Sequence, residues 1–356
     1  MKILHSADWH LDSPVQGRSP EQTQLLRKAL LKIPGQIGEV CRREQCDIML
    51  LAGDIFDGPF SLESYQAVYQ ALETVNVPVF VAPGNHDYAG AESPWLTKSW
   101  PKNVHVFTKT EIETVAVQAL NCRVYGAGFT SMDCQALLDG FEADTDMACT
   151  LGVFHGDPTQ VSSPYCPITK AQVKASGLDY LALGHIHKGG SFQAGKTLCA
   201  WPGCPMGRGY DEQGEKGVLI LTLEDTAAIE FVPLDTPRFY DLEVDALEDA
   251  AGSLASVLPA VGNENFYRIT LTGPSSPIDI SALRDLFSHF PNLELRDQTT
   301  PPVDIWANAG EDSFEGTYFQ LLQNALAASD EDTRRRIRLA ARISRQILDG
   351  QEVHLP

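Results

Sequence analysis

The chain has 356 residues, 43% hydrophobic and 21% charged, a composition typical of a globular protein with one large domain and a smaller one. Its formal net charge of −20 argues against a free-standing nucleic-acid binder with a basic face, although a local basic patch stays compatible with it. The longest apolar runs fall far short of the roughly 20 residues of a membrane-spanning helix, and the N-terminus lacks the apolar core of a signal peptide. We therefore expect a cytoplasmic protein without a membrane span.

Short apolar runs alternate with longer amphipathic runs over the first two hundred residues, and this pattern predicts a layered α/β core. We predict helices at 20–45 and 62–75. The predicted strands lie at Ile3–Leu4, 47–51, 77–82, 113–127, 148–155, 179–184 and 217–223. Eight cysteines without a Cys-x-x-Cys pair are expected to be buried, reduced thiols.

The pattern changes near residue 235, where Leu234–Pro237 is typical of a linker. A small α+β unit follows, with predicted strands at 239–244, 265–272 and 292–297 and predicted helices at 246–258 and 279–289. Pro301-Pro302 marks another boundary, and 311–350 is predicted to be helical. We therefore expect three parts: a large domain over 1–235, a small domain over 238–300 and a helical tail over 301–356.

The tail carries a basic helix face. Ser329 with Asp332 predicts a helix start of the capping-box kind. Beyond it, four arginines fall on one face: Arg334, Arg338, Arg342 and Arg345. This face is either a solvated side of a packed helix or a docking surface for a partner or nucleic acid.

Five short segments rich in Asp, His and Asn carry the chemical signal. They are Asp8-Trp9-His10, Gly53-Asp54-Ile55-Phe56-Asp57, Gly84-Asn85-His86-Asp87, His155 and Gly184-His185-Ile186-His187. Each follows an apolar run that is predicted to be a buried strand. Because ligands gather at the carboxyl ends of strands in an open α/β sheet, separate loops can bring these side chains to one place.

The residue types point to divalent metal ions. Carboxylate, imidazole and amide groups suit manganese, iron or zinc, and the absence of cysteine from the set argues against a structural zinc site. Asp54 could bridge two ions, and two ions would clamp the oxygens of an in-line displacement at phosphorus. Each segment alone has an ordinary alternative, a turn or a core histidine, and only their conjunction is specific. The remaining histidines are expected to be structural or on the surface: His5, His105, His289 and His354.

These segments together resemble the signature of the calcineurin-like metallophosphoesterases over roughly residues 1–225. Within that superfamily, Ile3–Leu11, Gly53–Asp57 and Trp201-Pro202-Gly203 are similar to the SbcD-type DNA repair exonuclease subunits. The resemblance implies a layered α/β/β/α sandwich as the fold of residues 1–235. It also implies that the small α+β unit is a cap domain, followed by a helical C-terminal tail.

The resemblance also implies residue roles. One metal would be held by Asp8, His10, Asp54 and His187, and the other by Asp54, Asn85, His155 and His185. His86 would protonate the leaving oxygen, with Asp87 close by to orient or tune it. The loop from Cys204 to Gly209, with Arg208, would be either a phosphate neighbour or a structural turn. Members with nuclease activity favour Mn²⁺, and they pair with an SMC-like ATPase of the SbcC type.

Three functions stay open on the sequence. The first is a two-metal phosphodiesterase acting on DNA ends as the nuclease subunit of an SbcCD-like repair complex, with a homodimer also possible. The second is a phosphoesterase for a small molecule or another non-DNA substrate, which the net charge of −20 favours. The third is a non-catalytic scaffold, which would not need the whole set of metal-site residues.

Overall fold

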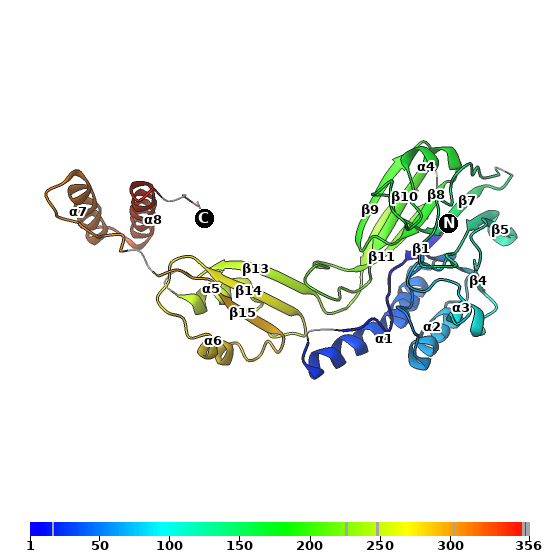
Figure 1. Ribbon diagram of the computed structural model, residues 1–356, viewed down its shortest axis with the longest axis horizontal. Helices are drawn as coiled ribbons and strands as arrows, with labels where there is room; N and C mark the ends of the chain where they lie inside the picture. The colour runs from blue at the N-terminus through cyan, green and yellow to red at the C-terminus, as the bar shows by residue number, and fades with distance from the viewer. Residues whose placement is uncertain are drawn as a thin grey trace. The chain divides into compact units, whose positions relative to one another are not determined.

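A computed structural model describes residues 1–15, 18–144, 146–224, 227–246, 249–301, 304–350 and 353 (Figure 1). Its contacts divide the chain into two compact units. The first comprises 1–242, 261–269 and 287–294, and the second comprises 243–260, 270–286 and 295–356. Within the described residues, no helix is both long and apolar enough to cross a membrane.

The first unit is built on two six-stranded sheets. The first sheet has the order β12-β11-β1-β2-β3-β4, with β1 (Lys2–Ser6), β2 (Ile48–Leu51), β3 (Val79–Val81), β4 (Val104–Val106), β11 (Gly217–Leu223) and β12 (Ala227–Pro233). The second has the order β5-β6-β7-β8-β10-β9, with β5 (Glu113–Val117), β6 (Cys122–Gly126), β7 (Cys149–His155), β8 (Tyr180–Gly184), β9 (Lys188–Ala194) and β10 (Thr197–Gly203). Strands β1 to β4 are parallel, as are β6, β7, β8 and β10.

The helices of this unit cover the outer faces of the sheets. They are α1 (Pro20–Arg43), α2 (Leu62–Val75), α3 (Pro94–Thr97) and α4 (Lys170–Ser176). The short 3₁₀ helix η1 (Gln118–Leu120) connects β5 and β6, and its Leu120 packs against the core between the sheets. Alternation along β1 fixes the layers, because neighbouring side chains on a strand point to opposite faces. Leu4 packs with α1 and α2, whereas Ile3 packs between the two sheets. The outer face of the second sheet packs against Val173 of α4. The α/β/β/α layering expected for residues 1–235 is therefore confirmed.

Serine side chains cap the N-termini of α1 and α2. Ser19 caps α1 by accepting from the Gln22 N–H, and the Gln22 side chain returns a bond to the backbone of Ser19, which forms a capping box. The predicted helices at 20–45 and 62–75 match α1 and α2 to within two residues.

Strands β4, β9, β10 and β12 have no counterpart among the predicted strands. All eight cysteines are free thiols, and seven are buried.

The chain beyond residue 238 contains a third sheet of order β13-β14-β15. Its strands are β13 (Phe239–Asp245), β14 (Phe266–Thr272) and β15 (Leu293–Asp297), and its helices are α5 (Ala250–Val257) and α6 (Ile280–Leu286). The tail forms α7 (Phe314–Ala327) and α8 (Glu331–Leu348). These elements follow the predicted α+β pattern and helical tail. The domain boundaries at 235, 300 and 301 stay predictions.

Two details of the tail differ from expectation. The cap of α8 is Asp330, whose side chain accepts from the Thr333 N–H, so the predicted start at Ser329 is wrong by one residue. Arg345 is not part of a solvated face, because it is buried, pairs with Glu315 and lies 4.2 Å from the Phe319 ring centroid.

Candidate metal centre

The predicted site residues meet at one edge of the first unit. They stand at or just beyond the carboxyl ends of β1, β2, β3, β7 and β8. Parallel strands bring their carboxyl ends to the same edge, so residues far apart in sequence become neighbours. The five segments therefore lie together, as the sequence predicts.

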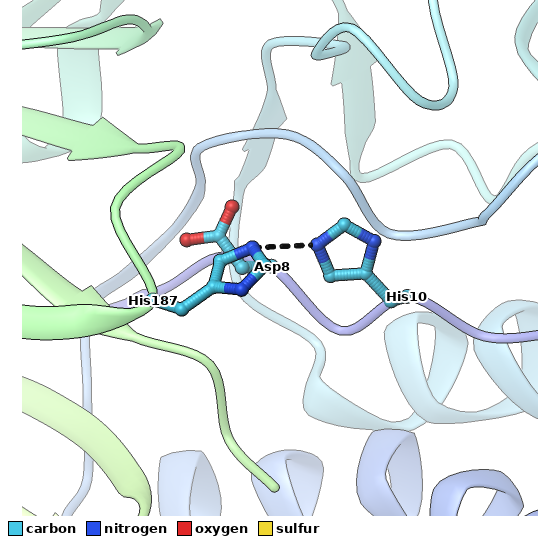
Figure 2. A group of neighbouring side chains, drawn as sticks. All are labelled: Asp8, His10 and His187. Atoms are coloured by element: carbon cyan, nitrogen blue, oxygen red, sulfur yellow. Dashed lines mark hydrogen bonds between the residues drawn. The ribbon is translucent and has the colours of Figure 1, made fainter. Parts of the chain in front are cut away.

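Asp8, His10 and His187 form the first group of donors, and Figure 2 shows their side chains converging. His10 Nε2 lies 3.0 Å from His187 Nε2. Asp8 Oδ1 accepts from the backbone N–H of His185 at 2.9 Å, while Asp8 Oδ2 is buried without a hydrogen-bond partner among the described residues. A buried carboxylate oxygen without a donor is costly, and a cation at this position would satisfy it.

The second group surrounds Asp54. Asp54 Oδ2 lies 3.4 Å from His155 Nε2 and 3.8 Å from His10 Nε2, so this carboxylate stands between the two groups. Asn85 Oδ1 lies 3.0 Å from His155 Nε2 and 3.2 Å from His185 Nδ1. All seven predicted ligands thus lie close together, and their division between two metals stays a prediction.

The backbone is constrained at this edge. Four of the seven residues have a left-handed backbone, with φ of 56° at Asp8, 49° at His10, 52° at Asp54 and 97° at His185. Such a conformation costs a non-glycine residue on the order of 1–3 kcal/mol and is retained where function needs it. This backbone conformation directs the four side chains toward the same region, and it lowers the local stability.

Two glycines let the strand ends approach one another. A Cβ at Gly53, whose φ is 85°, would lie 2.6 Å from His155 Nδ1. A Cβ at Gly84 would lie 2.8 Å from His155 Cγ and would overlap Asp54 Oδ1. The close contact between the exits of β2, β3 and β7 therefore requires glycine at both positions.

Electrostatics fit a divalent cation. Burial raises the pKa of Asp8 to about 7, and the negative charge of Asp54 adds to this while His187 opposes it. Burial lowers the pKa of His10 to about 4 and that of His155 to about 3. At neutral pH these imidazoles are uncharged, which is the form that binds a metal. The carboxyl of Asp8 favours its uncharged form in the absence of a cation, and neutral imidazoles lie beside it, so a cation would stabilise this donor set.

His86 differs from its neighbours because its side chain is 42% exposed. Its Nδ1 lies 2.9 Å from Asp57 Oδ1, and this bond raises the pKa of His86. Asp57 Oδ2 also faces His10 Nδ1 at 3.3 Å. Burial opposes the charge of Asp57, but its hydrogen bond to His86 and the nearby His10 imidazole hold the pKa of its carboxyl well below the usual range. Asp57 thus links the candidate acid to a candidate ligand.

Asp87 makes a different set of contacts. Its carboxylate accepts backbone N–H groups of Gly84 at 2.8 Å and of Ile55 at 2.9 Å, which ties the loop after β3 to the loop after β2. Burial raises the pKa of Asp87 to about 7. Its described bonds run to these backbone groups, and its predicted role beside His86 stays a prediction.

The segment 204–216 completes the site. Arg208 Nη2 lies 2.9 Å from Glu212 Oε1, and Arg208 Nη1 lies 3.4 Å from Asp57 Oδ2. Glu212 Oε1 in turn lies 2.6 Å from His187 Nδ1. The sequence places Arg208 near the site, but it gives no indication of Glu212 or of the role of Asp57. Asp57 stands inside one of the five segments, whereas nothing in the sequence around Glu212 marks it.

Two of the other histidines have structural settings. His5 is buried, with Nδ1 2.8 Å from Tyr180 Oη and Nε2 3.0 Å from the Leu183 carbonyl oxygen. His105 lies near the surface beside Glu113. His354 lies outside the described residues.

Comparison with known proteins points to one family. YhaO of Bacillus subtilis, an uncharacterized metallophosphoesterase, is 32% identical over 235 residues, which are 62% of this chain and 57% of YhaO. The SbcD component of the nuclease SbcCD from Staphylococcus epidermidis is 22% identical over 330 residues, which are 82% of this chain and 84% of that protein. A dimetal phosphatase from Danio rerio is similar in structure, with a TM-score of 0.45 and 13% identity over 65% of this chain and 95% of that one. Residues 1–189 match the family profile, and the chain belongs to the calcineurin-like phosphoesterases.

Proposed function

We propose that this protein hydrolyses phosphodiester bonds of DNA with two divalent cations, Mn²⁺ foremost, as the nuclease subunit of an SbcCD-like complex. The observation that carries the hydrolytic part is that the seven proposed ligands and the half-exposed His86 lie close together. The donors would hold the cations, and two cations would stabilise the negative charge that develops on a phosphoryl group in transfer.

The chain's own groups suit the remaining steps. His86 is accessible, and its Nδ1 is held by Asp57, so its Nε2 is free to give a proton to the leaving oxygen. Arg208 is held beside the centre by Asp57 and Glu212, and its side chain is partly exposed there. Proton transfer by His86 and anion binding by Arg208 are the roles we propose for these residues.

DNA as the substrate is supported by the extent of one similarity. The match to the SbcD component of the SbcCD nuclease covers 82% of the chain, more than the metallophosphoesterase layers alone occupy. Part of the chain beyond residue 235 is therefore included in a match to a protein named as part of a nuclease. A phosphoesterase of small molecules has no evident need of these additions.

A partner is supported by the tail. Helices α7 and α8 leave large apolar side chains exposed, namely Phe314, Leu321, Ile347 and Leu348. Apolar surface of this kind on a helical pair suits another helix, and we propose the SMC-like ATPase of the SbcC type as its source. Deleting 330–356 should abolish ATPase binding in a pull-down with purified partner while the metal content stays unchanged.

The decisive experiment compares substrates. With Mn²⁺, the purified chain should degrade linear DNA, and chelator should stop it. His86→Ala should abolish turnover with the metal content retained, whereas Asp54→Ala should lose both metal and turnover. Hydrolysis of small phosphate esters without any DNA cleavage, with or without the ATPase, would refute the nuclease proposal.

A second function has a specific observation in its favour. The net charge is −20, and arginines are paired with carboxylates both at the site, as Arg208 is with Glu212, and on the third sheet, as Arg268 is with Asp241 and Glu294. Such a surface gives a polyanion little attraction. A small-molecule phosphoesterase would show turnover that does not depend on the ATPase.

A further inference from the structure

Three charged residues of the segment 204–216 converge on one candidate ligand, His187. Glu212 Oε1 lies 2.6 Å from His187 Nδ1, Arg208 Nη2 lies 3.2 Å from the same nitrogen, and Lys216 Nζ donates to the His187 carbonyl oxygen at 3.4 Å. Glu212 is buried, so this contact is shielded from water. A segment that holds both the side chain and the backbone of His187 fixes the direction of its Nε2.

The centre has two halves, one with His10 and His187 and the other with His155 and His185. They differ in the groups that face the Nδ1 atoms of these histidines. In the His10–His187 half, both Nδ1 atoms face carboxylates, Asp57 at 3.3 Å and Glu212 at 2.6 Å. In the other half, His155 Nδ1 faces the neutral carbonyl oxygen of Ala52 at 2.8 Å, and His185 Nδ1 faces the neutral amide oxygen of Asn85 at 3.2 Å. A carboxylate behind a histidine makes its second nitrogen a stronger donor to a cation than a neutral acceptor does.

We propose that Glu212 is a positioning residue that secures the cation of the His10–His187 half, so that the two cation positions are unequal and this half is the tighter one. The inference rests on the metal assignment of the proposed function. Glu212 acts by keeping the Nδ1 proton of His187 in its hydrogen bond, which leaves Nε2 free for the cation. It also places a negative charge behind the imidazole that would bind that cation.

Arg208 distinguishes the proposal from a merely structural role of the segment 204–216, because its positive charge should affect cation binding in the direction opposite to Glu212. Its guanidinium touches both Glu212 and His187, so its positive charge works against a cation at Nε2. Removing this charge leaves the bond between Glu212 and His187 in place. Loss of Glu212 should therefore weaken the tight position, whereas loss of the Arg208 charge should not.

The test measures metal binding without substrate. The full chain is freed of metal with chelator and titrated with MnCl₂ in a calorimeter, and the bound ion is followed by electron paramagnetic resonance. The wild type should show a tight and a weaker binding event. Glu212→Gln should weaken the tight event about 10- to 100-fold and leave the weaker one unchanged. Glu215→Gln is the matched control, because Glu215 lies in the same segment but is exposed and pairs with Arg238.

Arg208→Gln is the second variant, and it decides the matter if Glu212→Gln fails to fold by circular dichroism. It should bind the first Mn²⁺ at least as tightly as the wild type. The proposal is overturned if the wild type binds both ions equally, if Glu212→Gln binds like the wild type, or if Arg208→Gln weakens the tight event. Loss of DNA cleavage alone bears on the proposed function and not on this inference, because the titration contains no ester.

Discussion

Changing Asp57 to asparagine should weaken catalysis most where the leaving group most needs a proton. Asp57 Oδ1 lies 2.9 Å from His86 Nδ1, and the hydrogen bond to this carboxylate raises the pKa of His86. An asparagine keeps the size but loses the charge. A hydrogen bond to a charged group contributes about 1.5–3 kcal/mol, and each 1.36 kcal/mol is a factor of ten in rate. We therefore expect kcat on DNA to fall roughly 10- to 150-fold.

The assay compares two esters. Bis-p-nitrophenyl phosphate releases a weakly basic phenolate that needs little help from an acid, so its kcat should fall much less than the kcat on DNA. Because Asp57 Oδ2 also faces His10 Nδ1, metal content is measured in parallel by elemental analysis. An equal loss on both esters at full metal occupancy would refute the reasoning, since Asp57 would then act on something other than proton donation.

Three further predictions concern stability. Gly84→Ala should lower the free energy of unfolding by about 1–3 kcal/mol and weaken Mn²⁺ binding, seen in melting and titration, because its Cβ would press on His155 and Asp54. Burial lowers the pKa of His5 to about 3, so below pH 6.5 only the unfolded chain takes its proton. In denaturant unfolding of the metal-free protein, the free energy of unfolding should therefore fall by about 1.3 kcal/mol less between pH 7 and pH 5.5 in His5→Gln than in the wild type. Arg345→Ala should cost the α7–α8 pair about 2 kcal/mol by leaving Glu315 unpaired, measured by hydrogen exchange.

The parts of the fold that could be predicted are those with strong local signals. The helix at 20–45 has a regular apolar stripe and a serine cap, and β2 and β8 are continuous apolar runs. Strand β9 lacks such a signal. The β9 sequence, Lys188–Ala194, begins with a lysine and two glycines and is exposed on several residues, so it is held by pairing with β10 and not by its own preference.

The site divides in the same way. The seven predicted ligands could be proposed from the sequence because each has a metal-binding side chain at or just beyond the end of a predicted strand. Glu212 is not, since its contact with His187 spans 25 positions and depends on how the segment 204–216 folds back. Asp57 lies in a segment that the sequence marks as part of the site, but its role could not be predicted. Only the structure shows that Oδ1 contacts His86 and that Oδ2 faces His10.

A chain with a net charge of −20 could still bind an anionic substrate, because cations held in the centre would supply positive charge where the phosphate binds. Without cations the centre offers a phosphodiester little attraction, because it is lined by the buried carboxyl groups of Asp8 and Asp54 and the charge of Arg208 is partly offset by Glu212 and Asp57. Two divalent ions would add four positive charges at the one place where the phosphate must bind, whereas the rest of a surface with net charge −20 would go on repelling the polymer. Tight binding of long DNA then requires positive charge from elsewhere, and a partner attached to the helical tail is where such charge can come from.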